Sequence, residues 1–431
     1  MVEYDFKNGE IADIVNNIII YAASSKASDI HFDPTNDGLL VRLRIDGLLS
    51  DHAFVSKDYQ RNLITRIKLI SGMNITESRL PQDGAIKGNI NGIDLDMRVS
   101  SLNTNLGEKI VIRILDYKES SKGLEYLGFS EKNLEKIKKM INVPNGIILI
   151  TGATGSGKTT TVYTMLQELN KKDTNIITVE DPIEMNIEGI NQVQVNPEIG
   201  LTFGRVLRSI LRQDPNIILV GEIRDNETAQ IAVRASITGH LVFSTIHTNN
   251  SLSTIERLMD MNVERYLLSS ALTGIVSQKL ARRLCPKCKK LRETTNYEKQ
   301  VFKKVLGKDV HEIYDAGNCD ECRNGYTGRI AIQEVLLIDD FLRDAINNEN
   351  ISREELKKLV YTKNVTTLLQ DGLEKVLEGI TSFSEIYKLI EIDDELGLQF
   401  DENMETKDVQ LPSSDEEMEK TEVLDLGLLN K

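Results

Sequence analysis

The stretch from Gly152 to Thr159 constrains this chain most, because it matches the pattern G-x-x-x-x-G-K-[ST] within TGATGSGKTTT. Glycines let the backbone turn so tightly that its N–H groups surround phosphate oxygens, and the helix that follows directs the positive end of its dipole at the anion. An apolar run at 147–150 precedes the motif and a helix-compatible segment follows it. This order of strand, loop and helix predicts a nucleotide-binding α/β core, whereas a chance match would lack that context.

The motif predicts a function for each of its residues. We expect Lys158 to reach the outer phosphates and the hydroxyl of Thr159 to hold magnesium. The other predicted nucleotide-binding positions are Gly152, Ala153, Thr154, Gly155, Ser156, Gly157 and Thr160. The cofactors predicted from this loop are therefore ATP and Mg²⁺.

Length and charge limit the class of protein. A chain of 431 residues with 40% apolar content is typical of a soluble globular protein with two or three domains. The net charge of −14 disfavours general nucleic-acid binding, which usually shows as a basic domain. The start, MVEYDFKNGE, lacks an apolar signal core and the apolar runs are far shorter than a membrane span, so we expect a cytoplasmic protein.

Changes in residue pattern divide the chain into segments. Apolar residues recur at helical spacing over 10–23, and short alternating segments follow up to residue 116, which predicts an α+β domain. Apolar runs of the buried parallel-strand type recur from Pro144 onward. The predicted segments are an N-terminal α+β domain (1–116), a linker (117–142), a RecA-like P-loop core (143–283), a tetracysteine subdomain (284–330), a helical C-terminal region (331–395) and an acidic disordered tail (396–431).

The predicted tail holds much of the negative charge. Residues 401–431 contain ten Asp or Glu and three Lys, a net charge of −7 that is half of the total. Few large apolar residues occur there before VLDLGLL, a composition typical of disorder. We expect this segment to aid solubility, with a specific docking role as the alternative.

Acidic side chains follow two of the apolar runs. Glu180, Asp181 and Glu184 lie in VEDPIE, and Glu222 ends IILVGE. Ligands of open α/β sheets bind beyond the carboxyl ends of the strands, so we expect these acids to meet the nucleotide. One acid can hold magnesium and another can orient or deprotonate the attacking water. Solvated loop acids are the alternative for any single carboxylate.

Two of the five histidines, His240 and His247, flank one apolar run in TGHLVFSTIHTNN. Their spacing of seven points the side chains to opposite faces of a regular strand, so they cannot both bind one metal ion unless the strand breaks. We interpret them as phosphate sensors or as residues that orient the phosphate-contacting groups. A satisfied core histidine is the alternative for each.

All four cysteines fall into two C-x-x-C pairs. Cys285 and Cys288 form CPKC, and Cys319 and Cys322 form CDEC. Two such pairs supply a tetrahedral thiolate set for zinc, although the 30 residues between them exceed the usual ribbon spacing. A redox pair or disulfides are the alternatives, which a reducing cytosol disfavours. We therefore predict a closed structural zinc site.

The ordered motifs of this chain resemble those of the secretion and type IV pilus assembly ATPases of the GspE and PilB kind. The resemblance covers roughly residues 20–395. The motifs that carry it are SDIHFDP, RLRIDG, RLPQDGAIKG, DMRVSSLNTNLGEKIVIRIL, TGATGSGKTTT, TVEDPIE, LRSILRQDPNIILVGEIRDNETA, TGHLVFSTIHTN and the paired C-x-x-C. Asn216 and Asn250 stand where the family often has Asp, a departure that we expect to matter little. Longer members carry an additional N-terminal domain, which leaves the mode of membrane recruitment open.

The resemblance implies roles for the residues already singled out. Lys158 and Thr159 would be the Walker A residues and Glu222 the Walker B acid. Glu180, Asp181 and Glu184 would form the Asp box, with Asp181 contacting the nucleotide, and His240 and His247 would form the His box. In the first domain, Arg98 and Arg113 would reach the nucleotide phosphates when the two domains close. Spacing alone left these two arginines open between that role and the solvated face of a small sheet.

The resemblance also implies how the protein works. It implies a homo-hexamer on the cytoplasmic face of the cell membrane, with an N-terminal domain of the PAS-like N2 type. ATP hydrolysis would drive a polytopic inner-membrane platform protein of the PilC or GspF type and so add pilin subunits. Retraction ATPases, by resemblance, lack the zinc knuckles, so the cysteines favour pilus assembly or secretion. A regulatory ATP-binding scaffold and a nucleic-acid translocase of related fold are the alternatives.

Overall fold

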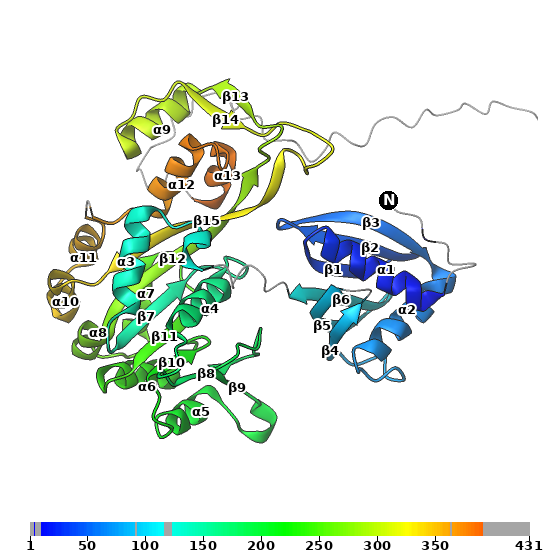
Figure 1. Cartoon of the computed structure of the whole chain (residues 1–431), viewed down its shortest axis with the longest axis horizontal. Coiled ribbons are helices and arrows are strands. Elements are labelled where there is room, and N and C mark those ends of the chain that lie inside the picture. The colour runs from blue at the N-terminus through cyan, green and yellow to red at the C-terminus, as the bar shows by residue number, and fades with distance from the viewer. Residues whose placement is uncertain (1–3, 5–9, 91–92, 116–122, 363, 391–431) are drawn as a thin grey trace, which may run out of the picture.

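A computed structural model of the chain describes residues 4, 10–90, 93–115, 123–362 and 364–390. An antiparallel sheet with two helices forms its N-terminal part (Figure 1). The strand order is β3-β2-β1-β6-β5-β4. Its elements are α1 (Ile11–Ser24), β1 (Ala27–Pro34), β2 (Gly38–Ile45), β3 (Leu48–Ser56), α2 (Lys57–Ile70), β4 (Gln82–Ile90), β5 (Ile93–Thr104) and β6 (Gly107–Leu115). The predicted α+β character of this region is confirmed.

Helical periodicity explains how α1 packs. Its buried residues Ile14, Val15, Ile18 and Ile19 recur at the spacing that places them on one face, as the sequence predicts. That face contacts β1 and α2, and all four residues belong to the same apolar core as the inward side chains of the sheet. On β2, buried and partly exposed residues alternate, because successive side chains of a strand point to opposite faces.

A seven-stranded sheet forms the centre of the second, larger part of the molecule (Figure 1). The order is β15-β12-β7-β11-β10-β8-β9, in which every neighbouring pair is parallel except β12 with β15. Its strands are β7 (Gly146–Thr151), β8 (Ile176–Glu180), β9 (Asn191–Gln194), β10 (Ile217–Val220), β11 (Leu241–Ile246), β12 (Leu272–Leu284) and β15 (Tyr326–Leu337). The four apolar runs of the sequence are β7, β8, β10 and β11, so the predicted parallel strands are confirmed.

Helices cover both faces of this sheet, which is why its central strands are apolar throughout. Ile147 and Leu149 of β7 join one core, and Ile148 and Ile150 join the other. The helices are α3 (Glu131–Ile141) and α4 (Lys158–Leu169) on one face, and α5 (Phe203–Ile210), α6 (Asn226–Ile237), α7 (Ser251–Asp260), α8 (Arg265–Ala271), α10 (Asp340–Asn347) and α11 (Arg353–Val360) on the other. Short 3-10 helices lie at η2 (Leu124–Leu127) and η3 (Pro197–Ile199).

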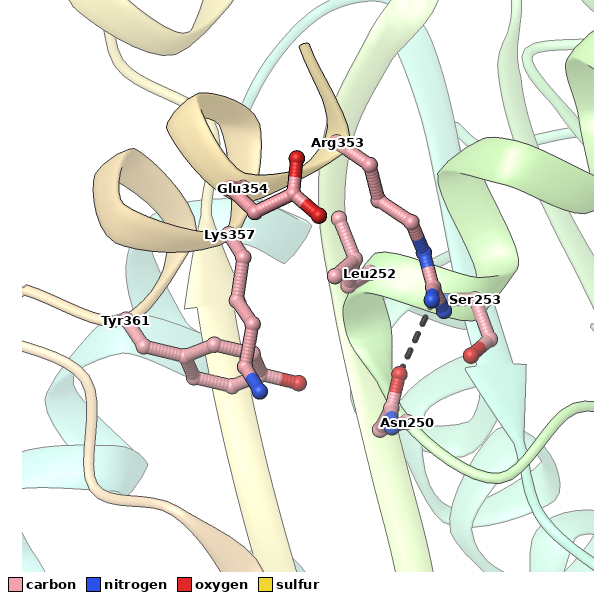
Figure 2. A pocket seen from close by; sticks show the side chains of 7 residues that line it. All are labelled: Asn250, Leu252, Ser253, Arg353, Glu354, Lys357 and Tyr361. Carbon is pink, nitrogen blue, oxygen red and sulfur yellow. Dashed lines mark hydrogen bonds between the residues drawn. The ribbon is translucent and has the colours of Figure 1, made fainter. Parts of the chain in front are cut away.

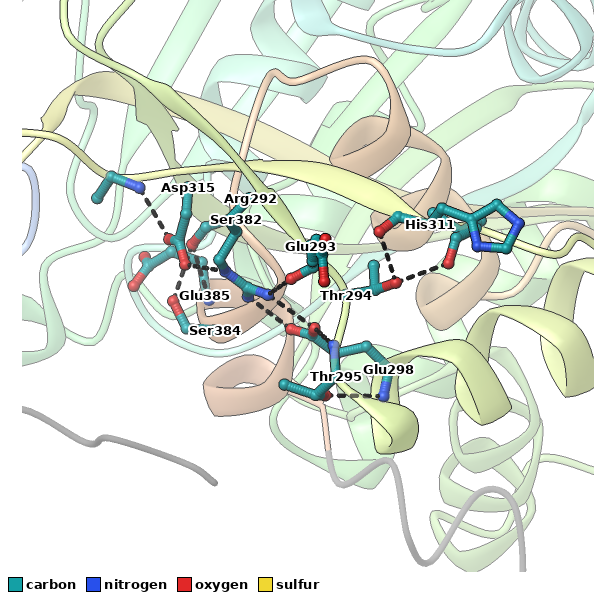
Figure 3. Close-up of polar contacts among 12 residues, drawn as sticks. Arg292, Glu293, Thr294, Thr295, Glu298, His311, Asp315, Ser382, Ser384 and Glu385 are labelled. Atoms are coloured by element: carbon teal, nitrogen blue, oxygen red, sulfur yellow. Dashed lines mark hydrogen bonds and ion pairs between the residues drawn. The ribbon is translucent and has the colours of Figure 1, made fainter. Parts of the chain in front are cut away.

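The cysteines lie in an excursion between β12 and β15. This excursion contains β13 (Lys290–Glu293), α9 (Asn296–Leu306) and β14 (Glu312–Asp315), and it packs with α12 (Leu368–Leu377) and α13 (Phe383–Leu389) around a separate apolar core. Arg292 holds it together, since its guanidinium contacts Glu298 at 2.6 and 2.8 Å and Asp315 at 2.7 Å (Figure 3). The side chain of Glu298 also completes the capping box of α9 with Thr295.

The elements cross some of the predicted limits between segments. Helix α3 falls within the predicted linker, and β15 crosses the limit predicted at residue 330. The division of the chain into domains therefore stays a prediction. The predicted acidic tail lies outside the described residues. Within the described part of the chain, every helix is too short or too polar to cross a lipid bilayer.

Candidate nucleotide-binding site

The glycine-rich loop connects β7 to α4, as the motif predicts. Gly155 and Gly157 adopt φ values of 78° and 87°, a left-handed conformation that glycine adopts without strain. Lys158 begins α4, and its ammonium donates to the backbone oxygens of Gly152 at 2.8 Å and Ala153 at 2.9 Å. Burial lowers the pKa of Lys158, while Glu222 opposes that shift. The loop is thus folded around its own lysine at the start of a helix, the geometry of a phosphate site.

Glu222 and His247 lie at the same edge of the sheet as the loop. The carboxylate of Glu222 pairs with Arg224 at 2.6 Å and lies 3.7 Å from Nε2 of His247. Burial lowers the pKa of His247, and the positive charge of Lys158 lowers it further. The imidazole of His247 and the carboxylate of Glu222 therefore lie near the lysine of the loop.

A chain of hydroxyl groups that the sequence did not predict fixes the segment after His247. The hydroxyl of Thr151, at the end of β7, contacts the backbone oxygen and the hydroxyl of Thr248 at 2.7 and 2.5 Å. Thr248 in turn lies 2.6 Å from the hydroxyl of Thr254 in α7. These bonds hold the histidine-bearing loop beside the nucleotide-binding loop. The sequence signal for Thr151 and Thr248 was their position beside Gly152 and His247, which are predicted site residues.

The acids of VEDPIE occupy three different environments. Glu180 is buried and accepts from Thr178 at 2.5 Å, from Gln192 at 3.1 Å and from Tyr163. Three donors of this kind suit a carboxylate that orders the loop. Asp181 is exposed, and Glu184 is half-buried.

Arg98 and Arg113 face this loop from the N-terminal sheet, where they are direct partners on β5 and β6. Arg98 donates to the backbone oxygen of Ile183 at 2.5 Å and pairs with Glu184 at 3.2 Å. Arg113 pairs with Asp29 at 3.0 Å, and its side chain is 59% exposed. Burial raises the pKa of Glu184, and the charges of Arg98 and Arg113 oppose that rise. The structure thus brings a predicted arginine of the N-terminal sheet to a predicted acid beside the larger sheet.

His240 lies elsewhere. It precedes β11, and its Nδ1 lies 2.9 Å from the backbone oxygen of Ala235. Because β11 runs parallel to β7, with Leu241 beside Gly146, His240 stands at the amino edge of the sheet. The length of the strand, about 20 Å at 3.3 Å per residue, separates it from the loop. Within one chain the two histidines therefore lie at opposite edges of the sheet, and the catalytic role of His240 stays a prediction.

The four cysteine sulfurs lie together, all within 4.8 Å of one another. The Sγ of Cys285 is 3.9 Å from that of Cys319, and the Sγ of Cys322 is 3.5 Å from Cys288 and 3.4 Å from Cys319. Zinc–sulfur bonds of about 2.3 Å in a tetrahedron place sulfurs about 3.8 Å apart, so this cluster fits zinc. All four are free thiols, which disagrees with the disulfide alternative.

The two asparagines that depart from the family pattern have local roles. Asn216 accepts from the backbone N–H of Asn175 at 2.7 Å. Asn250 caps α7 by accepting from the N–H of Ser253 at 2.9 Å, beside a pocket of about 220 Å³ between α7 and α11 (Figure 2). The pocket is lined by Asn250, Leu252, Ser253, Arg353, Glu354, Lys357 and Tyr361. An asparagine oxygen serves both bonds as an aspartate oxygen would.

A P-loop between strand and helix, with acids and a histidine at the carboxyl edge of a parallel sheet, defines a P-loop nucleotide-binding α/β protein. The family described as Type II/IV secretion system protein matches residues 5–388. The chain belongs to that family.

Individual proteins of secretion and pilus systems are similar to this chain over most of its length. The chain is 45% identical over 390 residues to the type II secretion system protein E of Dickeya dadantii, covering 89% of this chain and 77% of that protein. It is 43% identical over 380 residues to the type II secretion system ATPase E of Vibrio cholerae, covering 88% and 75%. The type IV pilus assembly ATPase PilB of Thermus thermophilus is 44% identical over 378 residues, covering 86% and 42%.

Solved structures share the fold. The pilus retraction motor PilT, solved with ADP, superposes with a TM-score of 0.62 at 26% identity and covers 89% of this chain and 98% of its own. The ATPase DotB of Legionella pneumophila gives a TM-score of 0.67 at 22% identity, covering 90% and 98%. The resemblance seen in the sequence is confirmed, and the mixed α/β fold is that of this group of ATPases.

Proposed function

We propose that this protein is a hexameric ATPase motor whose hydrolysis of ATP drives the assembly of a type IV pilus or of a secretion pseudopilus. One observation carries the proposal: Lys158, Glu222 and His247 meet at one edge of a parallel sheet beside a P-loop. A relative that is 43% identical over 88% of this chain is named an ATPase, which supports the same activity here.

The residues divide the work of hydrolysis as follows. Lys158 and the backbone of the loop bind the phosphates, and Thr159 would hold Mg²⁺, which would neutralise phosphate charge. Glu222 orients the attacking water or takes its proton, and His247 contacts the outer phosphate. Glu180 orders the Asp-box loop, because its oxygens are occupied by three donors, and Asp181 contacts the nucleotide.

Residues from the N-terminal domain complete the site. Arg98 contacts the Asp-box loop, and Arg113 is its register partner on the next strand. A guanidinium directed at phosphate stabilises charge in the transition state, so closure of this domain on the RecA-like core would raise the rate. The N-terminal domain thereby acts as the N2 domain of the family, and alternating closure around a six-membered ring generates force.

The partners follow from this assignment. The motor works at the cytoplasmic face of the cell membrane, where it turns a polytopic platform protein that adds pilin subunits. Zinc held by Cys285, Cys288, Cys319 and Cys322 stabilises the excursion between β12 and β15. Relatives in both pilus and secretion systems support the motor, and they leave the filament type to be settled by the neighbouring genes.

Two variants test the activity. Lys158→Ala should lower ATP turnover by at least about a hundredfold, because it removes a preorganised charge from the phosphates. Glu222→Gln should keep nucleotide affinity within about threefold and lose turnover, because the amide fills the same space without acting as a base. Turnover, ADP affinity by calorimetry and particle mass would be measured for each.

The wild-type chain separates the alternative functions. A motor turns over ATP as a hexamer, and its rate is unaffected by DNA. Stimulation by DNA would indicate a translocase, and a ring that binds ATP without turnover, even with the platform protein, would indicate a scaffold. Near-normal turnover in both variants would contradict the assigned site.

A further inference from the structure

Gln278, a buried residue of β12, contacts the backbone of the nucleotide-binding loop. Gln278 is 3% exposed, and its amide nitrogen donates to the backbone oxygen of Ser156 at 2.6 Å. Its amide oxygen accepts from the hydroxyl of Thr161 at 2.8 Å. Ser156 precedes Lys158 and Thr161 follows it, so one amide joins the loop to the first turn of α4 across the catalytic lysine.

Two glycines of the loop pack directly on this residue. A Cβ at Gly157 would lie 2.7 Å from the amide nitrogen of Gln278, and a Cβ at Gly152 would lie 2.4 Å from its backbone oxygen. The backbone oxygen leaves no room for a side chain at Gly152, and a side chain at Gly157 would displace the amide of Gln278. The loop therefore packs against Gln278 both at Gly152, near its start, and at Gly157, near its end.

A second buried glutamine fixes the orientation of the first. The amide nitrogen of Gln333, on β15, lies 3.3 Å from the amide oxygen of Gln278, which is its register partner on β12. Gln333 has no exposed surface, and its backbone N–H donates to Asp371 of α12 at 2.8 Å. Because two donors meet the oxygen of Gln278, its nitrogen is directed at Ser156.

We infer that Gln278 is a positioning residue of the nucleotide site, held in register by Gln333. The inference deepens the proposed ATPase function and rests on it. Gln278 sets the distance between the loop and α4 before the nucleotide arrives, and a preordered loop binds phosphate without paying an ordering cost. Phosphates order the loop once they are bound, so loss of Gln278 affects nucleotide binding more than the rate at saturation.

Replacement by an apolar residue of similar shape tests this inference. Gln278→Met should raise the Kd of ADP and the KM of ATP by about tenfold or more, which corresponds to about 1.4 kcal/mol. The kcat should stay within about threefold. Gln333→Met should raise the Kd less, and the double variant should bind no more weakly than Gln278→Met, because both changes act through one amide. Thr161→Val, which keeps the shape of its side chain, should also raise the Kd.

A matched control separates positioning from packing. Thr294→Val removes a buried hydroxyl that donates to the backbone oxygens of Val310 and His311 within the excursion between β12 and β15 (Figure 3). It should lower the melting temperature without changing the Kd of ADP. Unchanged Kd in both Gln278→Met and Thr161→Val, or strict additivity in the double variant, would overturn the inference. A wild-type chain that binds ADP but does not hydrolyse ATP would contradict only the proposed activity.

Discussion

At Glu184, a half-buried carboxylate meets Arg98 of the N-terminal sheet, and the burial of this carboxylate makes its charge sensitive to pH. Burial raises the pKa of Glu184, and the nearby charge of Arg98 lowers it. As the pH falls through that raised pKa, the carboxylate takes up a proton and the pair with Arg98 is lost. We therefore expect turnover to fall on the acid side as Glu184 is protonated.

The variant Arg98→Ala tests this coupling. Removing the positive charge raises the pKa of Glu184 further, so the acid limb of the kcat profile should move to higher pH and the plateau should fall by about a hundredfold. Arg98→Lys should keep most of the limb position but not the plateau, because an ammonium supplies charge without the fork. A limb that stays in place, or activity lost only through loss of the hexamer, would contradict a catalytic role.

Residues at strand ends were predictable from the residue pattern, whereas Arg98 and Arg113, which lie within strands, were singled out only by the family resemblance. Lys158, Glu222 and His247 each follow an apolar run, and parallel strands bring such positions to one edge. Gln278 lies inside β12 and contacts Ser156, which is 122 residues away. No local pattern encodes that pairing, because it depends on β12 entering the sheet beside β7.

At the scale of elements, the excursion between β12 and β15 depends on its four thiols. We expect one zinc ion per chain by elemental analysis, and a ratio near zero in the double variant Cys319→Ser, Cys322→Ser. Amides of β13 and β14 should then exchange hydrogen faster, while those of β7 should not, because the excursion has its own core. Metal-free protein with a disulfide, or equal loosening of β7, would contradict this prediction.

The types of the elements could be predicted from the pattern of apolar residues, whereas the pairing of β15 with β12 could not. The apolar runs of β7, β8, β10 and β11 could be assigned because buried parallel strands need no polar face. β15 pairs antiparallel with β12, and the whole cysteine excursion lies between these two strands in the sequence. Because this contact is distant in sequence, the core appeared to end at Arg283, although the sheet continues to Leu337.

At the scale of the whole molecule, the N-terminal sheet contacts the rest of the chain through Arg98 and, at a separate place, beside the turn between β2 and β3. Arg98 reaches the Asp-box loop, and the turn between β2 and β3, together with the start of β3, reaches β15 and the cysteine excursion that precedes it. In that turn, Asp46 accepts from the N–H of Gly328 at 2.9 Å, and Arg323 donates to Ser50 at 2.8 Å. Arg323 directly follows Cys322 of the cluster, so the predicted metal site lies beside this contact.

Loss of the second contact should loosen the domain arrangement without unfolding either part. We expect the double variant Asp46→Ala, Arg323→Ala to show a larger radius of gyration by small-angle scattering and lower turnover. Its unfolding free energy should change by about 0.5 kcal/mol or less, as is usual for surface positions. Arg79→Ala, which removes an exposed ion pair within the N-terminal domain, should change neither. An unchanged radius would show that the contact does not hold the domains together.

The cysteine excursion begins and ends at one rung of the sheet, since Leu284 pairs with Tyr326 and Cys285 donates to Gly325 at 2.8 Å. The excursion can therefore be replaced during evolution without breaking the pairing of β12 with β15, which lies beside the nucleotide-binding loop. Members of the family can therefore differ in this excursion while the nucleotide-binding sheet beside it stays the same. Among relatives, we expect insertions and deletions to concentrate between β12 and β15.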